Sequence, residues 1–93
     1  MRKTKFGALQ HLTFGEGTIW PSFEVMHFDE PGNPHAHELK EVAVCVAGSG
    51  FVDIEGEKTF LEPGEMIEIP GGKKHHMIPD VNHTFCMVIL YKS

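Results

Sequence analysis

Turn-forming residues interrupt the chain at short intervals over most of its length. Glycine, proline, asparagine and aspartate cluster between runs that are rich in β-branched and aromatic residues. A spacing of about eight to twelve residues between such turns is typical of an all-β sandwich or barrel. No convincing helical repeat of apolar residues extends beyond one turn. The expected strands cover residues 19–28, 41–47, 51–54, 58–61, 66–69, 74–78 and 84–91, after a loose N-terminal arm over residues 1–18 that could include a short strand near 9–14.

Composition limits the size of the fold and the kind of partner. The 93 residues allow one domain with one modest core. The net charge of −5 argues against nucleic acid as a partner, because no basic stripe is present to neutralise phosphates. No apolar run approaches the length that crosses a membrane. Cys45 and Cys86 match neither a disulfide scaffold nor a Cys-x-x-Cys site, so we expect reduced thiols and a cytoplasmic location.

Two histidines and a glutamate lead into an apolar strand. His35, His37 and Glu41 all occupy odd positions. In an extended chain alternate side chains share a face, whereas on a helix residues two apart point to nearly opposite sides. Glu41 begins the strand over 41–47, where a buried carboxylate is costly without a partner. Two imidazoles and a carboxylate at a strand end suit a first-row divalent metal, and the alternative is a polar loop with solvated histidines.

A further histidine follows a turn that is rich in glycine and proline. Residues 35–48 read His-x-His-x3-Glu-x6-Gly, which we call the first motif, and residues 64–75 read Gly-x5-Pro-x-Gly-x2-His, the second motif. Together they resemble the two motifs of the cupin superfamily, G-x5-H-x-H-x3/4-E-x6-G and G-x5-P-x-G-x2-H-x3-N. The resemblance covers about residues 20–91. Two positions depart from it: Asp29 stands in place of the opening glycine and Pro79 in place of the closing asparagine.

The resemblance implies a fold and a metal site. The fold is a double-stranded β-helix, or jelly roll, over residues 19–93, with a divalent metal inside the barrel. Three imidazoles and one carboxylate suit iron, manganese, nickel, copper or zinc. Four protein ligands on an octahedral ion leave two positions for water, substrate or dioxygen. The implied ligands are His35, His37, Glu41 and His75, and Glu41 is also a candidate proton acceptor during turnover.

The expected function is a metal-dependent reaction on a small organic molecule. Family members with such a ligand set include dioxygenases, isomerases, lyases and decarboxylases, so the fold alone does not select a reaction. We favour a dioxygenase because the ligand set suits redox metals. The alternatives are an isomerase or lyase, a non-catalytic sensor or carrier that keeps the pocket, and a metal-stabilised structural protein.

Other histidines and sulfur-containing residues are expected to have lesser roles. His27 could contact a metal ligand from the preceding strand, although a core or surface position is the stronger alternative. Cys86 and Met87 are expected to pack in the core, with lining of the barrel as the alternative. Solvated side chains are expected for His11, His76 and His83.

The alternation of the strand over residues 41–47 predicts a homodimer. If Glu41 faces the interior, then Val42, Val44 and Val46 face outward. Three outward valines form an apolar stripe that a small monomer should not expose. A second copy of the chain, or the N-terminal segment, would cover this stripe.

Overall fold

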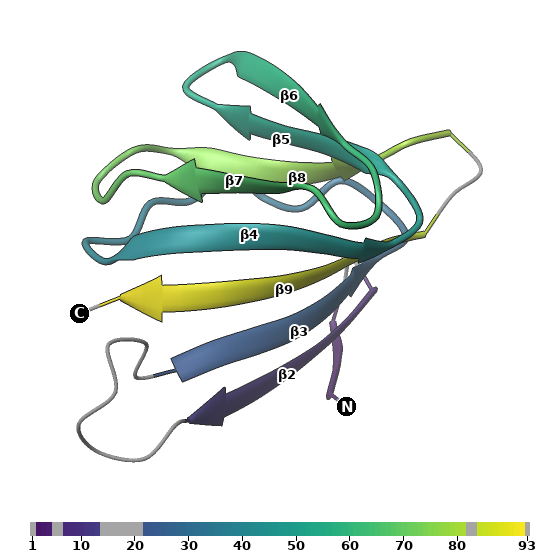
Figure 1. Ribbon diagram of the computed structural model, residues 1–93, viewed down its shortest axis with the longest axis horizontal. Helices are drawn as coiled ribbons and strands as arrows, with labels where there is room; N and C mark the ends of the chain where they lie inside the picture. The colour runs from purple at the N-terminus through teal and green to yellow at the C-terminus, as the bar shows by residue number, and fades with distance from the viewer. Residues whose placement is uncertain (1, 5–6, 14–21, 82–83, 93) are drawn as a thin grey trace.

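A computed structural model describes residues 2–4, 7–13, 22–81 and 84–92 (Figure 1). The regular secondary structure in these ranges is β-strand, and no helix there is long and apolar enough to cross a membrane. The strands are β1 (Arg2–Thr4), β2 (Gly7–Thr13), β3 (Ser22–Phe28), β4 (Lys40–Ala47), β5 (Gly50–Ile54), β6 (Glu57–Leu61), β7 (Met66–Ile69), β8 (His75–Pro79) and β9 (Phe85–Lys92).

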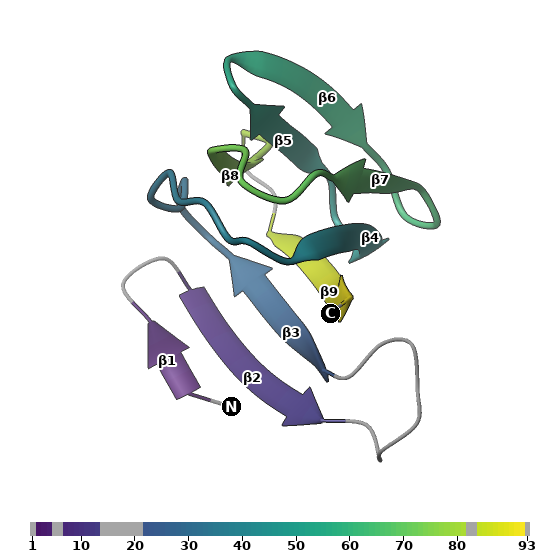
Figure 2. The ribbon, with the colours of Figure 1, turned by 90° about the vertical axis from the view of Figure 1, so that its left-hand side faces the viewer.

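The strands form two antiparallel sheets. The larger sheet has the order β1-β2-β3-β9-β4-β7, and the smaller has the order β6-β5-β8. Figure 2 shows the smaller sheet lying across from β4 and β9, while β1, β2 and β3 extend the larger sheet away from it. The C-terminal strand β9 lies between β3 and β4, so neighbours in the larger sheet are far apart in the sequence. This connectivity agrees with the expected all-β jelly roll.

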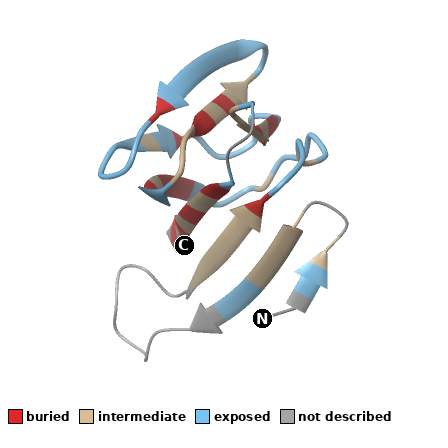
Figure 3. Ribbon diagram, turned by 90° about the vertical axis from the view of Figure 1, so that its right-hand side faces the viewer, coloured by how far each residue is buried: buried red, intermediate tan, exposed pale blue. Residues whose placement is uncertain are grey.

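The core lies between the two sheets and is built from alternate residues of their strands. On the larger sheet, Ala43 and Cys45 of β4 lie opposite Ile89 and Met87 of β9, and all four are at most 1% exposed. Figure 3 shows the resulting bands of buried and less buried positions along the strands. The smaller sheet contributes Val52, Leu61 and Met77.

The expected strands from residue 41 onward are confirmed to within one residue at each end. The expected strand over 19–28 is confirmed as β3 over residues 22–28, and its first three positions lie outside the described residues. Short turns separate strands whose alternation was readable from local sequence, which explains this agreement.

The N-terminal segment differs from the expected loose arm where the structure describes it. β2 pairs with β3 along its whole length, from Gly7 opposite Phe28 to Thr13 opposite Ser22, and β1 pairs with β2. The short strand that the sequence allowed near 9–14 is confirmed as β2, whereas the expectation of a loose arm is wrong over β1 and the start of β2. The physical reason is that β3 would otherwise present a row of unpaired backbone groups at the edge of the sheet. The domain boundary at residue 18 stays a prediction.

The outward valines of β4 differ from one another in exposure. Val42 is only 7% exposed, Val44 is partly buried and Val46 is 51% exposed. Val42 lies opposite Leu90 of β9, whose side chain stands on the same face of the sheet. The larger sheet thus covers part of the expected apolar stripe within one chain. The homodimer stays a prediction.

Gly48, which closes the first motif, is required for two reasons. Its φ of 70° lies in the left-handed region that favours glycine. In addition, a Cβ atom at this position would lie 1.6 Å from the carbonyl oxygen of Thr84. Gly64 opens the second motif and also has a positive φ, of 93°, but a Cβ atom there would meet nothing within 4 Å. The two motif glycines therefore share a positive φ, and only Gly48 also has a close backbone contact, so Gly64 serves as the control for Gly48.

We expect Gly48→Ala to lower the free energy of unfolding by clearly more than Gly64→Ala. A left-handed non-glycine residue costs about 1–2 kcal/mol, which is the whole expected effect at Gly64. At Gly48 the backbone near Thr84 must also move, so the loss should exceed about 3 kcal/mol. Urea unfolding followed by circular dichroism measures both losses. Equal losses would contradict the close approach at Gly48.

Candidate metal centre

The two histidines of the first motif lie on a segment that is not a regular strand. This segment connects β3 to β4 and runs beside β8. The His35 N–H donates to the His75 carbonyl oxygen at 2.9 Å, and the His75 N–H donates to the His35 carbonyl oxygen at 2.8 Å. The Gly72 N–H donates to the His37 carbonyl oxygen at 2.6 Å. These backbone bonds hold the first motif against the second.

The structure brings together the four residues that the two motifs single out. Glu41 is the first inward-facing residue of β4 and is 2% exposed, and His75 begins β8 and is 1% exposed. Glu41 Oε1 lies 3.3 Å from His37 Nε2, and Glu41 Oε2 lies 3.3 Å from His75 Nε2. One possible ligand atom from each of the four lies within 4.8 Å of the others. We call His35, His37, Glu41 and His75 the His/Glu cluster.

Backbone carbonyl groups orient two of the imidazoles. His35 Nδ1 lies 3.0 Å from the carbonyl oxygen of Asn33, and His75 Nδ1 lies 3.1 Å from that of Lys73. Because a carbonyl oxygen can only accept, Nδ1 carries the proton in both rings. In the neutral ring Nε2 then keeps a free lone pair. Histidines that bind metals usually have this arrangement, in which the bond at the far nitrogen holds the ring.

Two buried atoms of the His/Glu cluster have no hydrogen-bond partner. They are Glu41 Oε1 and His75 Nε2. Each lies 3.3 Å from an atom of another cluster residue, but these contacts are not aligned as hydrogen bonds. Leaving a buried polar atom unpaired costs about 1–3 kcal/mol, and more if it is charged. A first-row divalent metal ion would accept electron pairs from both, and it fits the mixed nitrogen and oxygen donor set.

The environment of His75 favours a positive charge at this position. Burial by itself lowers the pKa of His75, but the Glu41 carboxylate and the Lys73 carbonyl together raise it above its ordinary value of 6.5. A proton and a metal ion would therefore compete for His75 Nε2. Glu41 attracts both of them.

The His/Glu cluster lies at one side of a pocket of about 350 Å³. Glu41 and His75 form the buried side of the cluster, whereas His35 is exposed and 40% of the His37 side chain is exposed. The cluster is therefore accessible from one side. A mostly apolar pocket with a few polar groups is typical of sites for small organic molecules. The apolar wall includes Leu9, Met26, Phe28, Met77 and Ile89.

Among the polar lining residues that were not identified from the sequence, two are hydrogen-bonded to each other. The Tyr91 hydroxyl donates a hydrogen bond to Glu24 Oε1, and both side chains line the pocket. The Tyr91 ring also lies edge-on to the His37 ring, with 5.7 Å between centroids. Burial, and then the hydrogen bond to Glu24 and the charges of Glu24 and Glu41, raise the pKa of Tyr91 well above its ordinary value. The signal for both residues was alternation, because each occupies an inward strand position.

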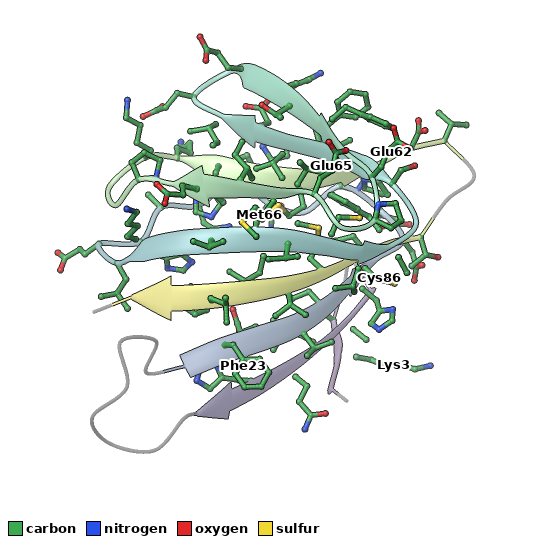
Figure 4. The ribbon with its side chains drawn as sticks, in the orientation of Figure 1. Lys3, Phe23, Glu62, Glu65, Met66 and Cys86 are labelled. Carbon is green, nitrogen blue, oxygen red and sulfur yellow. The ribbon has the colours of Figure 1, made fainter. Side chains whose placement is uncertain are left out.

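His27 and Cys86 lie on the face of the larger sheet that points away from the pocket. They are opposite each other in β3 and β9, and Cys86 Sγ lies 3.0 Å from His27 Nδ1. Cys86 is labelled in Figure 4. Met26 and Phe28 occupy the inward positions beside His27. A contact between His27 and a cluster residue is therefore excluded by the direction of its side chain. Met87 is fully buried in the core, as expected. The expectation of core packing is wrong for Cys86, which is only partly buried because its position in β9 directs it to the outer face of the sheet.

The remaining histidines lie outside the cluster. His76 is partly exposed and lies opposite Asp53 of β5, on the other side of β8 from His75. His11 is exposed, and its Nδ1 is 3.7 Å from Glu24 Oε2. His83 lies outside the described residues.

Residues 22–90 match the Cupin domain family, so the chain belongs to that family. It is 27% identical over 62 residues to acireductone dioxygenase 4 from Arabidopsis thaliana, a match that covers 61% of this chain and 33% of that protein. It is 32% identical over 65 residues to acireductone dioxygenase 1 from Coprinopsis cinerea, which covers 63% of this chain and 36% of that protein. The chain thus spans about a third of the length of these relatives.

The fold is shared with solved cupin structures. A cupin-like protein from Thermotoga maritima superposes with a TM-score of 0.80 at 16% identity, over 99% of this chain and 79% of that chain. At this identity the likeness concerns the fold alone. It agrees with the jelly roll that the two sheets form.

His75→Ala is expected to lower metal affinity by at least about tenfold, which corresponds to roughly 1.4 kcal/mol. The reason is that His75 directs a buried nitrogen at Glu41, so its loss removes one of four donors. His76→Ala is the matched control and should change stability by less than about 0.5 kcal/mol and leave the metal bound. Metal content and affinity, with circular dichroism to verify folding, measure the difference. Loss of metal from His76→Ala alone would show that the assigned register is wrong by one residue.

The metal-free protein should lose stability as the pH rises through the raised pKa of His75. Because this pKa is higher in the folded state, the contribution of His75 is fully present below its ordinary value of 6.5 and is lost above the folded value. Added metal should show the opposite trend, since it binds the neutral imidazole. Thermal unfolding of wild type and His75→Gln, with chelator and with metal, measures both trends. A pH-independent difference between the two metal-free proteins would contradict this assignment.

Proposed function

We propose that this cupin is a metal-dependent dioxygenase that acts on a small organic molecule. The observation that carries the proposal is the presence of two buried atoms without partners, Glu41 Oε1 and His75 Nε2, within a cluster of four donor residues. An ionised carboxylate that is buried without a partner costs several kcal/mol. A divalent metal ion held by His35, His37, Glu41 and His75 would remove that cost.

Each residue of the cluster has a definable part in this proposal. When bound, a first-row ion would supply Lewis-acid and redox chemistry at the open side of the cluster. Glu41 would offset part of the charge of the ion and could accept a proton from the substrate. The carbonyl groups of Asn33 and Lys73 would keep His35 and His75 in the tautomer that leaves Nε2 free. The apolar wall would exclude water around the substrate.

The choice of a dioxygenase is supported by the relatives. Two of them are named acireductone dioxygenases, and their matched segments cover 61% and 63% of this chain. Acireductone is therefore the first substrate to test, with dioxygen as the second. An isomerase or lyase reaction would proceed without dioxygen, which separates those alternatives from the proposal.

The test is metal content followed by oxygen uptake. Elemental analysis of the purified protein is expected to find about one first-row metal ion per chain, as for a single four-ligand site. An oxygen electrode would then follow dioxygen consumption by Fe(II)-loaded and Ni(II)-loaded protein with acireductone. His75→Ala should abolish most of the uptake, and His76→Ala should retain it.

The outcomes distinguish the classes of function. Metal binding together with tight binding of acireductone, but without oxygen uptake, would identify a carrier or sensor instead. Turnover under nitrogen would identify an isomerase or lyase. A protein that holds no metal, either as purified or after loading, would contradict the proposal at its first step.

A further inference from the structure

A carboxylate outside the His/Glu cluster also faces the pocket. Glu24 of β3 lines the pocket, and its side chain is only 16% exposed. Among the described lining residues it is the only acidic side chain outside the cluster, and none of them is lysine or arginine. Leu9 and Met26 line the same wall. A carboxylate in a mostly apolar wall is costly unless it is paired, and charged groups that line a pocket are candidates for a functional role.

Tyr91 lies between Glu24 and the cluster and holds Glu24 in place. In the larger sheet, Tyr91 of β9 is opposite Glu41 of β4 on one side and Ser22 of β3 on the other. Glu24 is two residues further along β3, and its Oε1 accepts the hydrogen bond from the Tyr91 hydroxyl. The two carboxylates therefore come from positions that are two strand spacings apart across the sheet and two residues apart along it, roughly 12 Å at the backbone. A small molecule can reach from one to the other.

The Glu24–Tyr91 pair offers acceptors to the pocket. The Tyr91 proton is directed at Glu24 Oε1, so the hydroxyl oxygen is left with lone pairs only. Glu24 Oε2 has His11 Nδ1 at 3.7 Å, which is beyond hydrogen-bond distance. A ligand group at this place must therefore donate hydrogen bonds. A positive charge would be attracted to Glu24, and a phosphate or carboxylate would be repelled.

We propose that Glu24, positioned by Tyr91, determines the ligand class of this pocket. The ligand is a small molecule whose one end binds at the His/Glu cluster and whose other end carries an amine or hydroxyl group that donates to Glu24. Molecules that end in a phosphate or a second carboxylate are rejected. This inference rests on the proposed function, because it takes the cluster as the metal-bound end of the site.

Two catechols with the same metal-chelating group test the proposal. One is 4-(2-aminoethyl)catechol, which has a cationic tail, and the other is 3-(3,4-dihydroxyphenyl)propanoate, which has an anionic tail. Calorimetric titration uses Ni(II)-loaded protein under nitrogen at about pH 8, where the amine of the first catechol is charged and the carboxylate of the second is ionised. We expect the amine to bind at least ten times more tightly than the carboxylate.

Variants assign the preference to Glu24. Glu24→Gln keeps the size of the side chain and removes its charge, and should reduce the preference to about twofold or less. Glu57→Gln removes the same charge from an exposed position on β6 and should keep the full preference. Tyr91→Phe leaves the charge on Glu24 but removes the bond that positions it, and should lower the preference while nickel binding is retained.

The outcomes separate this inference from the proposed function. If the wild-type protein binds nickel but binds both catechols equally, or prefers the carboxylate, the role of Glu24 is refuted whatever the variants do. A preference that persists in folded Glu24→Gln refutes it as well. If the protein binds no nickel, the proposed function fails and this inference fails with it.

Discussion

Two backbone hydrogen bonds between His35 and His75 hold the candidate site together. They join the segment between β3 and β4 to the first residue of β8, at 2.9 and 2.8 Å. Together with the bond from the Gly72 N–H to the His37 carbonyl oxygen, they fix the positions of His35 and His37 relative to Glu41. Because these bonds involve main-chain atoms only, the segment stays in place whatever the protonation of the imidazoles. The cluster is thus largely preorganised, which lowers the entropic cost of binding an ion.

The burial of the cluster is uneven, and this decides its electrostatics. Glu41 and His75 are almost fully buried, whereas His35 and His37 reach the surface. A buried carboxylate is destabilising unless a positive charge neutralises it, and both a protonated His75 and a metal ion can do so. The fold therefore retains an unfavourable arrangement at this one place. Arrangements that lower the stability of the fold at one place are typical of functional sites.

The larger sheet also sets the dimensions of the pocket. Glu41, Tyr91 and Glu24 come from the adjacent strands β4, β9 and β3, so the spacing of hydrogen-bonded strands fixes their separation. The same sheet supplies apolar lining next to these residues, with Ile89 opposite Glu24 and Met26 at the next inward position of β3. Specificity in such a site depends on which polar groups interrupt the apolar wall. Here the wall has an acidic group at the end away from the cluster.

Local sequence determined the strands from residue 41 onward and the identity of the four clustered residues. Strand alternation and turn chemistry act over a few residues, so the strands could be read without a structure. The four clustered residues followed from the resemblance to the cupin motifs, whose spacing after Gly72 selects His75 over His76. The tertiary structure decided the pairing of β2 with β3, the direction of His27 and the bond between Tyr91 and Glu24. These depend on the register between strands that are far apart in the sequence. That register is set by packing of the whole core, which no short stretch of sequence contains.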